Sequence, residues 1–157
     1  MSRQPLVRRF VFSCTILCLA SAVRPAAAAS PGISPQAILR ELDGPRGIAV
    51  LLGDQEAKLA VQMARQSELL IYVQLDSVEQ VAAARGALDS AGLLNRRVYA
   101  EQGSGAQIHL ADNLADLAVA CSAGLTPAAE NELLRVLRPG GKAWLDGKCV
   151  SKTQPAG

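Results

Sequence analysis

The stretch Gly47-Ile-Ala-Val-Leu-Leu-Gly53 decides the fold. It is a continuous apolar run bounded by glycines, which is typical of a strand buried on both faces of a parallel sheet. Residues 57–64 follow with apolar side chains at helical spacing, and the polar residues 65–68 end this pattern. The sequence therefore predicts a strand followed by a helix, which is the first unit of an α/β domain.

The same alternation continues on both sides of this unit. We expect further strands over residues 69–75, 97–101, 116–121 and 142–145, and helices over residues 78–91 and 126–137. Upstream, Ser34 and Pro35 predict the N-cap and the first residue of a short helix that ends before Gly44. This order of elements predicts a doubly wound, mostly parallel sheet that ends after its fifth strand.

The N-terminal segment has the composition of a secretory signal peptide. Arg3, Arg8 and Arg9 precede an apolar run over residues 10–23, and small residues follow at 26–30. The run is shorter than the roughly 18–20 residues that cross a bilayer, which favours a cleaved leader over an uncleaved anchor. We expect cleavage after Ala29, export to the periplasm or out of the cell, and no membrane association afterwards.

The composition of the residues after the leader is typical of one exported domain and indicates which partners to exclude. Four of the 16 Lys and Arg residues lie within residues 1–29, so 12 basic residues remain against 14 acidic ones, a net charge of −2. No basic stripe with interleaved aromatic residues remains, so we expect no nucleic-acid partner. His109 is alone and the cysteines form no CxxC pattern, so we expect no metal site. We divide the chain into a leader (1–29), an N-terminal helix (30–43), an α/β domain (44–148) and a tail (149–157).

Three motifs resemble class I S-adenosylmethionine methyltransferases. The stretch Leu133-Leu-Arg-Val-Leu-Arg-Pro-Gly-Gly-Lys-Ala-Trp-Leu145 resembles the segment that joins a helix to their fifth strand. Leu75-Asp76-Ser77 resembles the end of their second strand, where an acidic residue binds the cofactor ribose, and residues 115–119 resemble the start of their fourth strand. The resemblance spans residues 44–145 and implies a Rossmann-like fold of this class. It also implies that Gly53, Asp54 and Asp76 stand where that family binds its cofactor.

A second resemblance concerns the domain context. Residues 47–53, 66–75 and 108–114 resemble a methyltransferase-like module of large secreted planctomycete proteins, in which the module precedes a pyrroloquinoline-quinone-type (PQQ-type) β-propeller. This likeness implies that the chain is that module without its propeller. A β-propeller is then the partner domain found in longer relatives.

The expected cofactor site departs from the methyltransferase pattern. Those enzymes have a glycine-rich GxGxG turn after the first strand, whereas this chain has Gly53-Asp54-Gln55-Glu56-Ala57. Asp54 and Glu56 would place negative charge beside the cofactor carboxylate. After the third strand, Gln102-Gly103-Ser104 replaces the acidic residue that contacts adenine in the family.

We therefore expect a non-catalytic structural or interaction module that binds no cofactor. S-adenosylmethionine would bind only if the ancestral site were intact. Two alternatives stay open. One is an active methyltransferase of unknown acceptor, and the other is a protein that binds a nucleotide-like ligand between the first and fourth strands.

Asp76 and the two cysteines after the leader have competing explanations. Asp76 either contacts a ribose or caps the helix that starts near Ser77. Cys121 and Cys149 follow strands that we expect to be neighbours, so a disulfide between them would close a loop of 28 residue steps. The alternative is a buried free Cys121 and an unpaired Cys149 in the tail.

Overall fold

The computed structural model describes residues 34–44, 46–122 and 124–153. The expected leader and its cleavage site lie outside these residues, as do residues 30–33 of the expected N-terminal helix. Helix α1 (Pro35–Arg40) begins as predicted, because the Ser34 hydroxyl accepts a hydrogen bond from the N–H of Ala37 and Pro35 follows the cap.

The elements alternate as the sequence predicts. After α1 come β1 (Arg46–Leu52), α2 (Lys58–Gln66), β2 (Glu68–Leu75), α3 (Val78–Ser90), β3 (Val98–Gln102), β4 (Ala115–Ala120), α4 (Pro127–Val136), β5 (Leu137–Leu145) and β6 (Lys148–Ser151). They form one sheet in the order β3-β2-β1-β4-β5-β6. All neighbouring strands are parallel except β5 and β6. The predicted doubly wound sheet is confirmed, and its strand order reverses between β1 and β4.

The C-terminal part of the sheet differs from the prediction in two ways. Strand β5 begins at Leu137, directly after α4, and an irregularity opposite Asp116 lets residues 138–141 bulge out before the regular pairing resumes. The sheet also has a sixth strand in place of the expected tail. Asp146 and Gly147, both with positive φ, form a tight turn that pairs β6 with β5 in antiparallel fashion.

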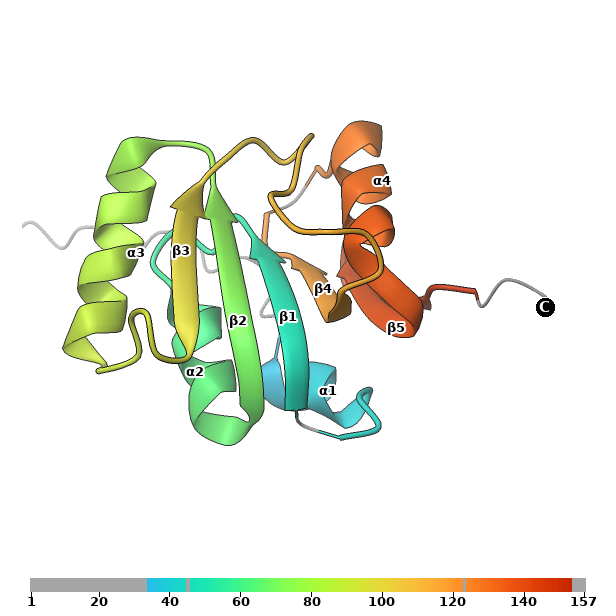
Figure 1. Ribbon diagram of the computed structural model, residues 1–157, viewed down its shortest axis with the longest axis horizontal. Helices are drawn as coiled ribbons and strands as arrows, with labels where there is room; N and C mark the ends of the chain where they lie inside the picture. Colours follow the sequence, from blue (N-terminus) through green and yellow to red (C-terminus); the bar gives the residue numbers. More distant parts are fainter. Residues whose placement is uncertain (1–33, 45, 123, 154–157) are drawn as a thin grey trace, which may run out of the picture.

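Two apolar layers enclose the sheet. Helices α1, α2 and α3 pack on one face against side chains such as Ile71 and Leu117. Helix α4 packs on the other face against Val50 and Ala118. Figure 1 shows α2 behind the lower part of β2 and β3, α3 to the left of β3, and α4 beside β4 and β5. No described helix is long and apolar enough to span a bilayer.

Candidate functional site

The carboxyl ends of β1, β2 and β4 surround a hollow of about 240 Å³. Ligands of doubly wound sheets bind outside the carboxyl ends of the strands, at the point where the strand order reverses. Glycine, alanine and hydroxyl side chains form much of the lining, including Ser122 and Thr126 at the start of the segment that leads into α4. We take this hollow as the candidate site.

Gly53 and Asp76 both line the hollow. The N–H of Gly53 donates to the carbonyl of Gln74 at 3.1 Å, and a Cβ at this position would lie 2.9 Å from Ser122 Oγ. The close approach of these two strand ends therefore requires glycine. Asp76 is exposed at the end of β2, and the cap of α3 is Ser77, whose hydroxyl accepts from the N–H of Gln80. The expectation that Asp76 caps α3 is wrong.

Asp54 does not line the hollow, because its carboxylate turns back under α2. Oδ2 accepts from the N–H of Ala60 at 2.8 Å, and Oδ1 accepts from the N–H of Leu59 at 3.4 Å. Only 8% of the residue is exposed, and this burial raises the pKa of Asp54 although both backbone N–H groups stabilise the charged form. The carboxylate thus satisfies N–H groups of the first turn that could otherwise bind an anionic ligand.

This geometry corrects the electrostatic argument made from the sequence. The carboxylate of Asp54 was expected beside the cofactor, but it lies against its own helix. Glu56 also faces elsewhere, since its carboxylate pairs with Lys58 on the outside of α2. Neither acidic group of the turn is part of the hollow.

Gln74 holds the loop that follows β3 against the candidate site. Its side chain is 1% exposed, and Nε2 donates to the carbonyls of Ser104 at 2.7 Å and Gln107 at 2.8 Å. Its Oε1 accepts from the N–H of His109 at 3.2 Å. A Cβ on Gly103 would lie 2.8 Å from Gln74 Cδ, so the loop packs tightly on this amide. Gln74 was not predicted from the sequence as a functional residue. A polar residue inside an otherwise apolar strand does, however, indicate a buried hydrogen-bonding role.

Arg135 of α4 fixes the far end of the same loop. Its guanidinium donates to both oxygens of Glu132 at 2.9 and 2.8 Å, to the carbonyls of Ile108 at 2.9 Å and Leu110 at 3.1 Å, and to the carboxylate of Asp112. The hydrogen bonds to Glu132 and Asp112 raise the pKa of Arg135, and the bond to Arg135 lowers the pKa of Glu132. The loop is thus held by β2 at one end and by α4 at the other.

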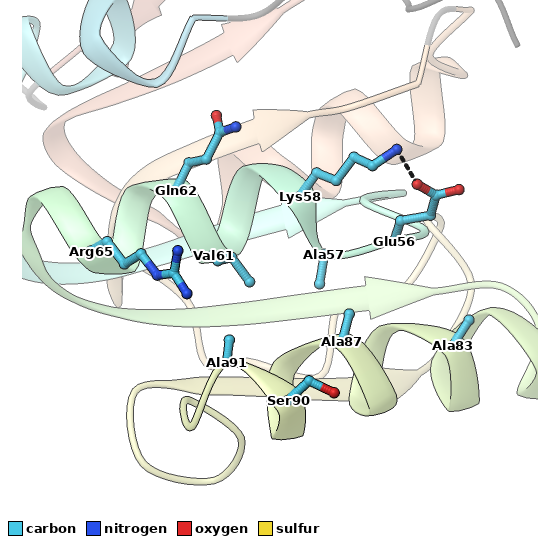
Figure 2. A pocket seen from close by; sticks show the side chains of 10 residues that line it. All are labelled: Glu56, Ala57, Lys58, Val61, Gln62, Arg65, Ala83, Ala87, Ser90 and Ala91. Carbon is cyan, nitrogen blue, oxygen red and sulfur yellow. Dashed lines mark ion pairs between the residues drawn. The ribbon is translucent and has the colours of Figure 1, made fainter. Parts of the chain in front are cut away.

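A larger hollow of about 660 Å³ lies between α2 and α3 (Figure 2). Figure 2 shows Val61 and Arg65 of α2 on one side, and Ala87 and Ala91 of α3 on the other. The charged side chains there are solvated, and neither Gly53 nor Asp76 is part of the lining. The groove therefore brings together none of the residues predicted for a cofactor.

The described residues contain no group of three or more His, Cys, Asp or Glu side chains placed to hold a metal ion. Cys121 and Cys149 are free thiols, so of the two alternatives the disulfide is not formed in this structure. Cys149 lies opposite Trp144 in the hairpin, and β5 separates β6 from β4. Two strand spacings amount to about 9.6 Å, which exceeds the Cα distance of about 4.4–6.8 Å that a disulfide needs. Burial raises the pKa of the Cys121 thiol, which packs beside the core.

No protein-family model and no curated protein matches this chain. Solved structures do match it. A candidate S-adenosyl-L-methionine-dependent methyltransferase from Methanococcus maripaludis is 26% identical with a TM-score of 0.66, over 71% of this chain and 52% of that one. The [4+2]-cyclase SpnF is 24% identical with a TM-score of 0.61, over 69% and 42% of the two chains.

A third match is the geranyl diphosphate C-methyltransferase of Streptomyces coelicolor, solved with Mg²⁺, geranyl diphosphate and S-adenosyl-L-homocysteine. It is 13% identical with a TM-score of 0.62, over 69% of this chain and 42% of that one. These structures establish a class I methyltransferase-like Rossmann fold, and this chain spans about half of their length. One of the three is named as a cyclase, so the fold alone does not fix a reaction.

Proposed function

We propose that this chain is an exported, non-catalytic domain that uses a methyltransferase-like fold as a structural or interaction module. The buried carboxylate of Asp54 carries the proposal. It accepts hydrogen bonds from the second and third N–H groups of α2, where a ligand's anionic group would have to bind. A ligand at this helix terminus must displace a carboxylate that the chain itself supplies.

The size and the walls of the hollow support the same proposal. A volume of about 240 Å³ lies below the roughly 300–1,000 Å³ of typical ligand pockets. The loop over residues 103–109 borders this space and is held by Gln74 through three backbone hydrogen bonds. Enlarging the hollow would require breaking these bonds.

A calorimetric titration with S-adenosylmethionine tests the proposal. We expect no heat beyond that of dilution at millimolar ligand. A dissociation constant near 1 μM, about −8 kcal/mol, would overturn the assignment as a module that binds no cofactor.

The second candidate is a module that binds a nucleotide-like ligand, with or without methyl transfer. It is favoured by the presence of Gly53 and Asp76 in one hollow at the switch point. If a ligand with a ribose binds there, Asp76→Asn should weaken its binding, because the acidic residue accepts hydrogen bonds from ribose hydroxyls. Asp43→Asn, an exposed position after α1, is the matched control and should leave binding unchanged.

Export and domain context belong to the same proposal. The basic start, the apolar run and the small residues at 26–30 support removal of a leader, so N-terminal sequencing of the exported protein should begin at Ser30. Recovery of a chain that retains residues 1–23 would contradict this. The likeness to modules that precede PQQ-type propellers makes a propeller the first domain to look for in the reading frame after Gly157.

A further inference from the structure

Strand β6 forms one edge of the sheet with unpaired backbone groups. Its four residues are exposed, and Val150 shows 44% of its surface. Lys152 exchanges backbone hydrogen bonds with Gly140 and Gly141 of β5. Because hydrogen-bonded and non-bonded pairs alternate in an antiparallel ladder, Lys148 and Val150 also bond to β5. Cys149 and Ser151 therefore direct their N–H and C=O groups away from the sheet.

The opposite edge of the sheet is protected and β6 is not. On β3, Arg85 of α3 donates from Nε to the carbonyl of Ala100 at 2.9 Å and pairs with Glu101 at 3.0 Å. Such side-chain cover blocks the pairing of a further strand. Among the described residues, no side chain makes a hydrogen bond to the backbone of Cys149 or Ser151. The β6 edge can therefore accept another strand.

The charged side chains around β6 determine which charge a strand must carry to pair with this edge. The hairpin over residues 142–152 contains Lys142, Lys148 and Lys152 and one acidic residue, Asp146. Within the described part of the chain, none of the three lysines forms an ion pair with a carboxylate. The ammonium group of Lys142 donates to Ser151 Oγ, and that of Lys152 donates to Asn113 Oδ1 and to the carbonyls of residues 135 and 137. Glu41 lies near Cys149 on the other face of the hairpin. Among the described residues, Lys148 is therefore the free cation of this edge.

We propose that the β6 edge binds an extended segment of another protein by strand addition. The segment carries an acidic side chain opposite Lys148 and an apolar one opposite Val150, two positions that share a face of the strand. A second copy of this chain fits poorly in the register centred on Val150. Two β6 strands paired antiparallel about Val150 would place Lys148 opposite Lys152 of the partner subunit, and like charges in that position are unfavourable.

This inference names the partner chemistry of the proposed interaction module and rests on that role. It does not depend on the hollow at the carboxyl ends of the strands. The peptide titration below and the S-adenosylmethionine titration use the same protein and have separate readouts. Failure of one therefore leaves the result of the other interpretable.

The probe is the fluorescein-labelled peptide Thr-Glu-Thr-Val-Thr-Glu-Thr, whose palindromic sequence allows either strand direction. Peptide anisotropy reports binding, and intrinsic fluorescence reports its place, because Trp144 is the only Trp and pairs with Cys149 across the hairpin. We expect saturable binding with both signals changing together. Of two peptides that are N-methylated on alternate amides, only the one methylated on the amides that face β6 should lose binding.

Variants of the full chain test the charge and the edge. Lys148→Glu should weaken binding about tenfold, because it replaces an attractive pair with a repulsive one. Lys58→Glu, on the exposed surface of α2, is the matched control and should bind as the unaltered chain does. Cys149→Pro should abolish binding while the circular dichroism spectrum stays native, since it removes an outward-facing N–H group.

Several results would overturn the proposal. These are no saturable signal at millimolar peptide, equal binding of both N-methylated peptides, and equal binding of a peptide with Lys in place of Glu. A stable dimer in sedimentation experiments that excess peptide does not dissociate would assign the edge to a second copy.

Discussion

Replacing Gln74 with methionine tests whether this amide holds the loop after β3. Methionine has a similar length and no branch, so it fits the buried position without a large change of shape. The substitution removes the donor to the carbonyls of Ser104 and Gln107 and the acceptor for the N–H of His109. It also removes the acceptor for the Tyr72 hydroxyl, which lies 3.4 Å from Oε1. The loop then keeps its attachment to Arg135 and loses its attachment to β2.

The expected loss of stability follows from the three bonds to the loop, because the bond from the half-buried Tyr72 hydroxyl is long and water can replace it. Each intramolecular hydrogen bond contributes about 0.5–1.5 kcal/mol, which gives about 1.5–4.5 kcal/mol in total. Water can reach the released backbone groups, because their residues are exposed: Ser104, Gln107 and His109. The free energy of unfolding should therefore fall by an amount near the middle of this range, about 2–3 kcal/mol. Urea unfolding followed by far-ultraviolet circular dichroism measures this difference at constant m-value.

Gln107→Ala is the matched control, because only the backbone of Gln107 bonds to Gln74. It should change the free energy of unfolding by less than about 0.5 kcal/mol. If Gln74→Met is as stable as the unaltered chain, or if Gln107→Ala costs as much as Gln74→Met, the amide does not hold the loop.

Three further changes should have measurable effects on stability. Gly47→Ala should cost at least about 2 kcal/mol in urea, because φ is +116° and the new Cβ would collide with the Asp116 carboxylate, whereas Gly44→Ala has open space and should be neutral. Arg135→Ala should cost about 2 kcal/mol and speed proteolysis within residues 108–112. Burial raises the pKa of Asp54 in the folded state above its unfolded value of about 3.9. At a pH between the unfolded and the folded pKa, Asp54 is therefore protonated in the folded chain and charged in the unfolded one. Stability relative to Asp54→Asn should therefore fall as pH rises above about 4 and level off above the folded-state pKa, and a flat or rising difference would contradict this assignment.

The strands of the sheet could be predicted because their burial leaves a simple pattern. Residues 48–52 and 117–120 are buried almost throughout, and both runs are apolar along their whole length. Strand β6 leaves no such pattern, because its four residues are exposed and pair through the backbone. Asp146-Gly147 is a hairpin signal, but it shows a turn and not how far the second strand extends.

The candidate site was predicted in position and not in detail. Gly53 and Asp76 both line the hollow, because the carboxyl ends of parallel strands lie at the same edge of the sheet. The direction of the Asp54 carboxylate depends on the turn that follows, in which Ala57 adopts a left-handed conformation with φ of 51°. Alanine gives no sequence signal for that conformation. The partners of Gln74 in the loop lie 30–35 residues away and are backbone groups, which have no side-chain signature.

The hydrogen bonding at the carboxyl edge explains how the fold can persist without a ligand. Among the described residues, every buried side-chain nitrogen or oxygen has a hydrogen-bond partner within the protein. The Asp54 carboxylate accepts hydrogen bonds from backbone N–H groups in the first turn of α2, and the Gln74 amide bonds to backbone groups of the loop after β3. A ligand that used both the start of α2 and the loop would have to replace both sets of bonds, and each leaves a buried polar group that costs about 1–3 kcal/mol when unpaired. Removing either side chain alone should therefore not create a cofactor site, since the other would still hold its part of the edge closed.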